Sequence, residues 1–577
     1  MKKRSHRVPK PNQTEDAATK QGSSRRAFFG QLGGAAAATI AATSLLDPVA
    51  NAVGLPSPTI VGDTPGLVSG PARAQQAYNL RQTAAFNQLQ VPLPNHVNNG
   101  DETNYPTYCF NYHKGLPHDS NGNVTSSAYQ SLLTATRSGA VADFAAIPLG
   151  GTQPLVDPQA GLAYSMYGAD AAALAIPPAY SGASAGTAGE MVECYWMALC
   201  RDVPFAMYGQ EPLTSAAITE LNRLGVFQGP KQNGQVTAQT LFRGQAWSDL
   251  IGPYVSQFFV QQAPFGELTQ PLDSQGNPGQ LYNTYTPGVN YMTDFSSWLA
   301  VQNGQGPFAA DTVSGSAYLN DGRGLSAFVH VDELFQAYFM GALFLLDNHY
   351  AYNVGNPYQN GTITNQSGFG TFGNPGAAHL LTEVSVPALK AEWYEKWFVH
   401  RRNRPEAYGG LVHLTKTNQQ VYPINQQVLN SNAINMVFAN YGTYLLPMAF
   451  PEGCPQHPAY GEGHAVVAGA CATIIKAYWN ENTVIANPVY SADGATLSPY
   501  TGSDAGQITV GTEANKIAYN VGLGRVHAGV HWRSDYWQGM LLGEALAISI
   551  LRDERNNYNQ PFNGFTFTKF NGTTITV

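Results

Sequence analysis

Charged residues are scarce in this chain of 577 residues. Lys, Arg, Asp and Glu together make up 12%, while Phe, Trp and Tyr alone reach 11%. Because so few charges are available for a solvated surface, we expect much of the chain to be buried, either in its own core or against further copies of itself. The composition therefore predicts a homo-oligomer.

Cysteine is rare as well. The cysteines are odd in number, and no two of them form a Cys-x-x-Cys pair; they are Cys109, Cys194, Cys200, Cys454 and Cys471. This pattern indicates neither a disulfide framework nor a zinc site built on paired thiolates. We expect buried free thiols.

Linkers, repeats and long apolar segments are missing too. The 59 glycines and 37 prolines are scattered along the chain, and no charged tract or Ser/Gly-rich stretch divides it. This predicts one large, loop-rich domain over residues 53–577, behind a short leader. No apolar stretch after the leader is long enough to cross a bilayer, so we expect no membrane contact once the leader is removed.

The leader itself, residues 1–52, has the pattern of a twin-arginine export signal. Ser-Arg-Arg-Ala-Phe-Phe at 24–29 precedes a mildly apolar run over 33–46, and Ala-Asn-Ala at 50–52 forms a small-residue cleavage site. The apolar run is too short and too rich in Ala and Gly for a membrane anchor. We expect export of the folded protein to the periplasm or the extracellular space.

The charge balance excludes one class of partner. Residues 1–52 hold eight basic and three acidic residues, so the rest of the chain carries 22 basic and 35 acidic residues, a net charge of about −13. A chain this acidic is not expected to bind nucleic acid.

Apolar periodicity predicts a mainly α fold, a helical bundle with long loops and a few short hairpins. The spacing of Thr187 and Glu190 predicts a capping box at the start of the first of the expected helices. Loops with short hairpins are expected over 252–325 and 352–376. The expected helices are 187–202, 328–349, 388–402, 426–440, 464–479 and 534–552.

Three patches in the C-terminal third carry side chains that can hold an oxyanion. They are Lys396 with Arg404-Pro405, Gly461-Glu462-Gly463-His464, and Arg525 with Gly529 and His531. Guanidinium forks, an ammonium group and imidazoles are donors to a tetrahedral anion. Each patch lies at a predicted helix end, so the three could converge on one anion. The third patch precedes a helix that we expect Ser534 to cap.

In order and spacing the patches resemble the vanadium-dependent haloperoxidases, which share their anion site with the type 2 phosphatidic acid phosphatase superfamily. The pattern is Lys396-x7-Arg404-Pro405, then Gly-x-Gly-His at 461–464, then Arg525-x3-Gly529-x-His531-x3-Asp535. Segments 99–102, 146–150, 157–161 and 195–199 look like the algal-type bromoperoxidase branch. The likeness covers about residues 75–556 and implies the helical bundle of that family.

The resemblance implies a vanadate cofactor. His531 would be the vanadium ligand, with Asp535 orienting it, while Lys396, Arg404 and Arg525 would neutralise the vanadate oxygens beside the backbone of Gly463. His464 would be the acid/base residue, and His457 matches the second active-site histidine of the bromoperoxidase branch. Lys396 would also polarise peroxide.

The implied activity is the oxidation of bromide and iodide by hydrogen peroxide to a hypohalous-acid-type species, which would halogenate small organic acceptors. Chloride is less expected because of His457. Algal members of the family form even-numbered assemblies, so a dimer or a larger assembly is expected here.

One position departs from the family. Its anion loop reads Pro-Ser-Gly-His, and here Glu462 takes the place of the serine. Three outcomes are open: Glu462 is protonated and donates as the serine would, it turns towards a Lys or Arg, or vanadate binds poorly. We favour a raised pKa, because like charges in one pocket push a proton onto one of them.

Two other functions stay open at this point. The same pocket suits an acid phosphatase, with His531 as nucleophile and His464 protonating the leaving group. Alternatively, Glu462 prevents catalysis at the site, and the chain is a non-catalytic relative of the family. A zinc pair of His527 and His531 is not favoured, because no third ligand follows at zinc spacing and Arg525 disfavours a cation. Trp393 and Trp397 are expected in the core.

Overall fold

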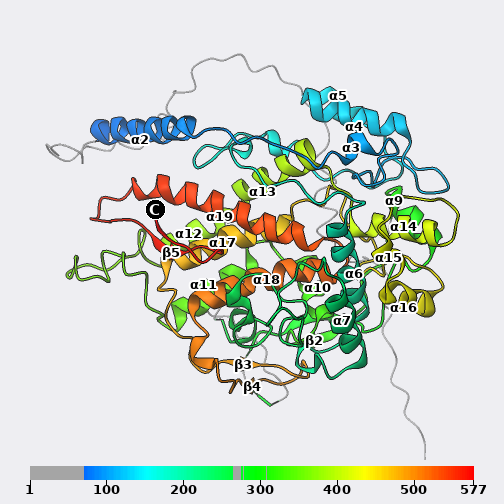
Figure 1. The fold of residues 1–577 in the computed structure, drawn as a ribbon. Coiled ribbons are helices and arrows are strands. Elements are labelled where there is room, and N and C mark those ends of the chain that lie inside the picture. Colours follow the sequence, from blue (N-terminus) through cyan, green and yellow to red (C-terminus); the bar gives the residue numbers. More distant parts are fainter. Residues whose placement is uncertain (1–69, 264–274, 277–278, 307) are drawn as a thin grey trace, which may run out of the picture. The chain divides into compact units, whose positions relative to one another are not determined.

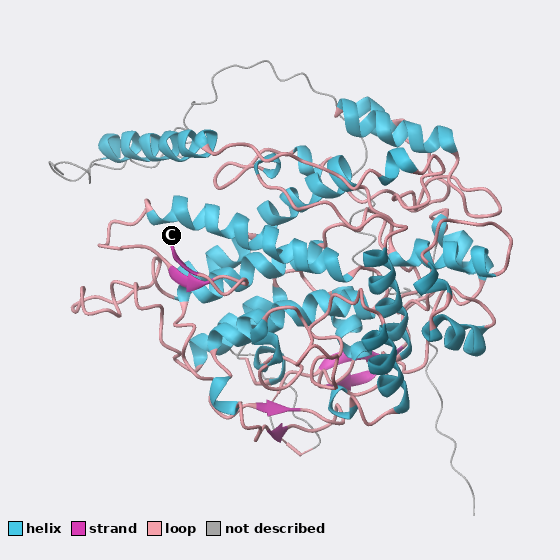
Figure 2. Cartoon of the chain, viewed as in Figure 1, coloured by secondary structure: helices cyan, strands magenta, loops and turns pink. Residues whose placement is uncertain are grey.

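Helices dominate the part of the chain that the computed structural model describes, residues 70–263, 275–276, 279–306 and 308–577 (Figures 1 and 2). The predicted leader lies outside these residues. Residues 74–577 form one compact unit. The mainly α prediction is confirmed by α2 (Gly70–Gln90), α3 (Asp101–Asn104), α4 (Ser126–Ser138), α5 (Val141–Ala145), α6 (Ala185–Leu199), α7 (Pro212–Arg223), α8 (Gln257–Val260), α9 (Phe295–Gln302), α10 (Gly322–Val331), α11 (Gln336–Asp347), α12 (Asn374–Glu383), α13 (Ser385–Tyr394), α14 (Pro405–Lys416), α15 (Gln426–Leu429), α16 (Asn432–Tyr441), α17 (Gly463–Tyr478), α18 (Val510–His527) and α19 (Arg533–Arg555).

Strands in the described residues form three short antiparallel pairs. β1 (Tyr282–Tyr285) pairs with β2 (Val313–Ala317), β3 (Val489–Tyr490) with β4 (Ser498–Pro499), and β5 (Thr566–Thr568) with β6 (Thr574–Thr576). Figure 2 shows these strands as small additions to the helices. Short hairpins are therefore present, but not where they were expected: β3–β4 and β5–β6 lie outside 252–325 and 352–376, and α9 separates β1 from β2. No larger sheet is built from the described strands.

The central helix is α17, which packs along α18 and α19 (Figure 1). Every residue of α17 except His464 is buried. Glycines allow the close crossing of α17 and α19, because a Cβ on Gly469 would collide with the Met540 carbonyl, and one on Gly543 with the Val466 carbonyl. This crossing fixes where the N-termini of the two helices lie, and both termini carry predicted site residues.

Three predicted helices match closely and three are broken. The matching stretches are 187–202, 464–479 and 534–552, which correspond to α6, α17 and α19. Residues 328–349 cover the end of α10 and all of α11, which meet at a bend of 100°, and 426–440 divides into α15 and α16. The stretch 388–402 continues from α13 into a π-helical turn, η7 (Glu395–His400), rather than a straight α-helix. Extra residues in such turns commonly mark functional sites.

Helix α18 was not predicted, and its burial explains why. All 18 of its residues are buried, so its polar residues contact other segments rather than solvent and the amphipathic pattern of a surface helix is missing. The capping prediction for α6 is wrong: Ser184, not Thr187, accepts the capping hydrogen bond at the helix N-terminus. Glu190 instead bonds to the Arg402 side chain.

Two further expectations can be compared with the described residues. All five cysteines are free and buried, as predicted. No single described helix has the length and hydropathy needed to cross a bilayer, although the bent pair of α10 and α11 meets both criteria together.

The α17–α19 crossing generates a stability prediction. Gly543→Ala should lower the free energy of unfolding by about 1–3 kcal/mol, because the added methyl overpacks a backbone contact. Chemical denaturation measures this. Gly225→Ala is the matched control, since a Cβ there meets nothing within 4 Å; equal effects of the two substitutions would contradict the close-packing explanation.

Candidate active site

The three predicted patches meet in one buried region within residues 74–577. Lys396 lies in η7, Arg404 is the residue before α14, and Arg525 occupies the last turn of α18. The loop at 461–464 leads into α17, and His531 precedes α19. Lys396, Arg404, Glu462, Arg525 and His531 are all buried. The convergence expected from the sequence is therefore present.

Arg404 joins the first patch to the third. Its Nη1 lies 2.7 Å from Nε2 of His531 and donates to the Val530 carbonyl at 2.8 Å. Its Nη2 lies 3.0 Å from Nδ1 of His457, and its Nε donates to the His457 carbonyl at 3.0 Å. The backbone of Arg404 is extended, with φ −88° and ψ 154°, as expected for a residue before Pro405.

Lys396 is held by backbone carbonyls. Its ammonium group donates to the carbonyls of Pro458 and Ala459, each at 2.9 Å, and to that of Gly461. Burial lowers the pKa of Lys396 to about 7. Burial also raises the pKa of Glu392, one turn earlier, to about 7. Glu392 was not predicted: a glutamate in a helix gives no sign of its burial.

Asp535 orients His531. Its Oδ2 lies 2.9 Å from Nδ1 of His531 and accepts from the Trp532 amide at 3.0 Å, while its Oδ1 accepts from Arg402 at 3.0 Å. Burial, and then Arg404, hold the pKa of His531 well below its usual range. The imidazole is therefore neutral, with a proton on Nδ1 towards Asp535 and a lone pair on Nε2.

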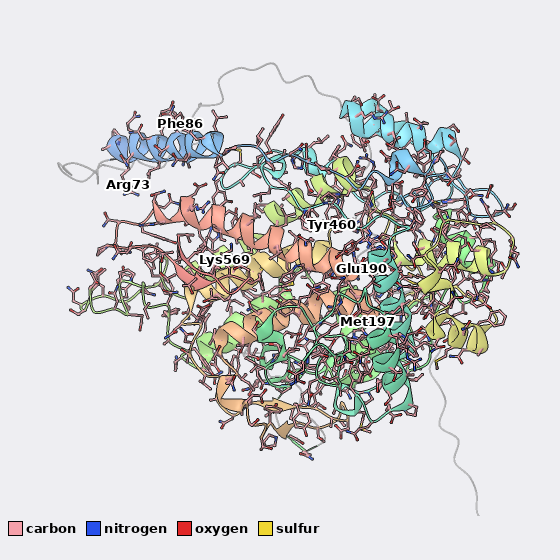
Figure 3. All side chains as sticks on the ribbon, in the orientation of Figure 1. Arg73, Phe86, Glu190, Met197, Tyr460 and Lys569 are labelled. Atoms are coloured by element: carbon pink, nitrogen blue, oxygen red, sulfur yellow. The ribbon has the colours of Figure 1, made fainter. Side chains whose placement is uncertain are left out.

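The start of α19 corrects one prediction. Asp535, rather than Ser534, caps the helix, because its carboxylate accepts the Trp532 amide. The Ser534 amide instead donates to Glu190 at 2.6 Å, and its hydroxyl accepts from Arg402 at 2.8 Å. Figure 3 labels Glu190 and Tyr460, two side chains beside Arg402. These contacts hold the Arg402 side chain, which in turn binds Asp535.

His464 and Arg525 are held by the end of α10. Nε2 of His464 lies 3.0 Å from Oδ1 of Asp332, the residue that ends α10. Nη1 of Arg525 donates to the Val329 carbonyl at 2.7 Å, and its guanidinium carbon lies 5.5 Å over the ring of Phe450. Nε of Arg525 is buried and has no hydrogen-bond partner in the part of the chain that the structure describes. Asp332 was missed because it falls inside the helix predicted over 328–349.

His457 brings an unpredicted aromatic residue into the site. The rings of Trp393 and His457 lie 4.7 Å apart at 33°, and the Lys396 ammonium lies 5.7 Å over Trp393. Trp393 is half-buried and packs against the core as expected, but α13 also places it at the site beside η7. Trp397 is fully buried in the core, as expected.

Glu462 lies in the middle of these cations. It precedes α17, makes no capping bond, and neither of its carboxylate oxygens has a hydrogen-bond partner within the described residues. Burial raises the pKa of Glu462 well above its usual range, against the opposing influence of Arg525. No ion pair within 4.0 Å joins it to a Lys or Arg of the described chain. Of the three outcomes considered, the protonated carboxyl group agrees best with this environment.

The residues present fit a tetrahedral oxyanion. Lys396, Arg404 and Arg525 concentrate positive charge, and the uncapped first turn of α17 offers the amides of Gly463 and His464. The unpartnered Nε of Arg525 is a further donor. A protonated Glu462 is a donor rather than a repelling charge. A metal cation without oxygen ligands would be disfavoured by so many cationic groups.

The raised pKa of Glu462 predicts a pH-dependent stability. The protonated form contributes fully below about pH 4.5, and this contribution is lost as the pH rises towards the raised folded pKa. Relative to Glu462→Gln, the wild type should lose up to about 1.4 kcal/mol per pH unit in that interval. Denaturation in buffers free of phosphate and vanadate measures it. A difference that stays constant with pH would show that Glu462 is ionised throughout.

Comparisons with known proteins agree with this geometry. A family model described as the VCPO second helical-bundle domain matches residues 381–560. A vanadium-dependent bromoperoxidase of Corallina officinalis is 32% identical, with 88% of this chain and 98% of that one covered. One from Ascophyllum nodosum is 33% identical, over 87% and 92%.

A solved structure agrees as well. The homohexameric structure of the second vanadate-dependent bromoperoxidase of Ascophyllum nodosum superposes with a TM-score of 0.82 at 32% identity, covering 90% of this chain and 93% of that one. From this likeness along nearly its whole length, the chain belongs to the vanadium-dependent bromoperoxidase family.

Proposed function

We propose that this protein is a vanadate-dependent haloperoxidase that oxidises bromide, and iodide, with hydrogen peroxide. The product is a hypohalous-acid-type species that halogenates small organic acceptors. The observation that carries the proposal is the position of Arg404, between the neutral His531 and His457 in the region that Lys396 and Arg525 make positive. Family membership supports the same activity.

In this proposal Nε2 of His531, which faces Arg404 in this structure, would be the ligand to vanadium. Lys396, Arg404 and Arg525 would neutralise the vanadate oxygens. Bound vanadate supplies a Lewis acid that activates peroxide without a change of oxidation state. Asp535 fixes the His531 tautomer that leaves Nε2 unprotonated.

His464, supported by Asp332, carries out the proton transfer. Oxidation of bromide consumes one proton: bromide, hydrogen peroxide and a proton give hypobromous acid and water. The pKa of His464 is lowered, chiefly by burial, so its imidazole can accept a proton from peroxide and return it during turnover. The Asp332 carboxylate at 3.0 Å orients the ring and stabilises its protonated form.

Glu462 takes the part of the family serine in this scheme. Protonated, its carboxyl group donates one hydrogen bond to an oxyanion oxygen, as a hydroxyl would. His457, whose ring lies against Trp393 and which Arg404 contacts, supports bromide over chloride by its match to the bromoperoxidase branch. Neither the acid phosphatase nor the non-catalytic alternative gains support from the relatives.

Export and assembly complete the proposal. The twin-arginine pattern in residues 1–52 supports transport of the folded protein out of the cytoplasm. The scarcity of charge and the homohexameric relative support a homo-oligomer, a dimer or larger.

Bromination of an organic indicator tests the activity. Vanadate-loaded wild type should brominate monochlorodimedone with bromide and hydrogen peroxide, and the vanadate-free protein should not. His464→Ala should lower kcat by about 10²–10⁴-fold, because the acid/base group is lost, while the vanadium content stays near one per chain. His413→Ala, on α14, is the control. A wild type that turns over no halide would contradict the proposal.

Vanadate affinity tests the role of Glu462. Glu462→Ser should retain or strengthen binding at neutral pH, since a hydroxyl replaces a protonated carboxyl group as donor. Equilibrium dialysis with vanadium analysis gives both dissociation constants. As the pH rises, the wild type should weaken relative to Glu462→Ser, because the ionised carboxylate repels the anion. Clearly weaker binding by the serine variant at neutral pH would assign the carboxyl group a different role.

A further inference from the structure

The C-terminal turn of α10 lies against two residues of the site. The Val329 carbonyl accepts from Arg525 at 2.7 Å, and Asp332 lies 3.0 Å from His464. His330 stands between Val329 and Asp332 in the sequence, and no role has been given to it so far. Its ring makes its own set of contacts at the edge of the site.

His330 is clamped by two carboxylates from different segments. Its Nδ1 lies 3.2 Å from Oδ2 of Asp311 and 2.5 Å from the Tyr285 hydroxyl, and its Nε2 lies 2.8 Å from Oε1 of Glu452. Burial alone would lower the pKa of His330, but the hydrogen bonds to Asp311 and Glu452 raise it. The ring is therefore an imidazolium that donates in both directions.

The same three residues could in principle ligate a metal ion, since their ligand atoms lie within 4.8 Å of one another. The geometry favours the clamp instead. Each nitrogen of His330 already faces a different carboxylate, whereas a metal ion needs a nitrogen lone pair and both carboxylates directed to one point. Asp311 and Glu452 therefore hold a cationic ring in place.

The clamped ring reaches Arg525 through Phe450. The rings of His330 and Phe450 are stacked, with centroids 3.8 Å apart and planes at 8°. The Arg525 guanidinium carbon lies 5.5 Å over the same ring. Phe450, itself 1% exposed, therefore contacts both His330 and Arg525.

We propose that His330 is a positioning residue for Arg525. Asp311 and Glu452 fix the His330 ring, the ring fixes Phe450, and Phe450 together with the Val329 carbonyl fixes the guanidinium group. Nε of Arg525, which has no hydrogen-bond partner among the described residues, then remains available to the oxyanion. This inference rests on the proposed vanadate site and deepens it, because it places the support for one vanadate contact outside the family motif.

Vanadate affinity, measured by equilibrium dialysis with vanadium analysis, tests the inference. His330→Ala in the full chain should raise the dissociation constant by about tenfold, as expected when support of a first contact is lost. His413→Ala is the matched control: His413 is also a buried histidine stacked on a phenylalanine, 5.6 Å from the Phe295 ring, and should leave the constant unchanged.

A double-mutant cycle separates positioning from general destabilisation. If His330 acts through Arg525, then His330→Ala should have almost no effect on vanadate affinity in an Arg525→Ala background. If the alanine variant does not fold, His330→Phe carries the same test, because it keeps a ring on Phe450 while losing both carboxylate contacts.

Two results would overturn the inference alone. One is a vanadate dissociation constant that stays at the wild-type value in His330→Ala, or in His330→Phe if the alanine variant does not fold. The other is a change in vanadate affinity that is equally large in the wild-type and the Arg525→Ala backgrounds. In both cases the wild type still binds vanadate, so the proposed function stands. A wild type that retains no vanadate at any concentration tested overturns the proposed cofactor and this inference together.

Discussion

The buried guanidinium group of Arg404 is the contact on which the site depends. It is 1% exposed and meets His531, His457 and the Val530 carbonyl. A buried cation is stable only where acceptors surround it. These acceptors come from the segments that lead into α17 and α19, so the partners of Arg404 and the close crossing of the two helices require each other.

Charge balance then gives the site its preference for an anion. Lys396, Arg404 and Arg525 are all buried, and among the described residues no ion pair within 4.0 Å joins them to an acid; burial raises the pKa of Glu392, near Lys396, to about 7. Asp535 is bound by Arg402, and burial raises the pKa of Glu462 well above its usual range. A tetrahedral oxyanion is the kind of ligand that supplies the missing negative charge and accepts from several donors at once.

Much of the site was predictable because its residues lie on short segments at helix ends. Gly461 to His464 leads into α17, and Asp535 follows His531 by one turn, so sequence spacing translated directly into spatial distance. Asp332, Glu392 and Trp393 were not predictable as site residues. They come from α10 and α13, and only packing brings those helices to the anion loop. The π-helical turn that carries Lys396 likewise has no amphipathic pattern of its own.

On its own, the sequence determined the set of chemical groups and their order: the cations, the imidazoles, the glycine-flanked loop and the glutamate at 462. Tertiary structure decided which carboxylate serves which group, Asp535 for His531 and Asp332 for His464. It also raised the pKa of Glu462 through burial. Spacing within a segment is set by local backbone geometry, whereas a pKa and a distant partner depend on how completely other helices exclude water.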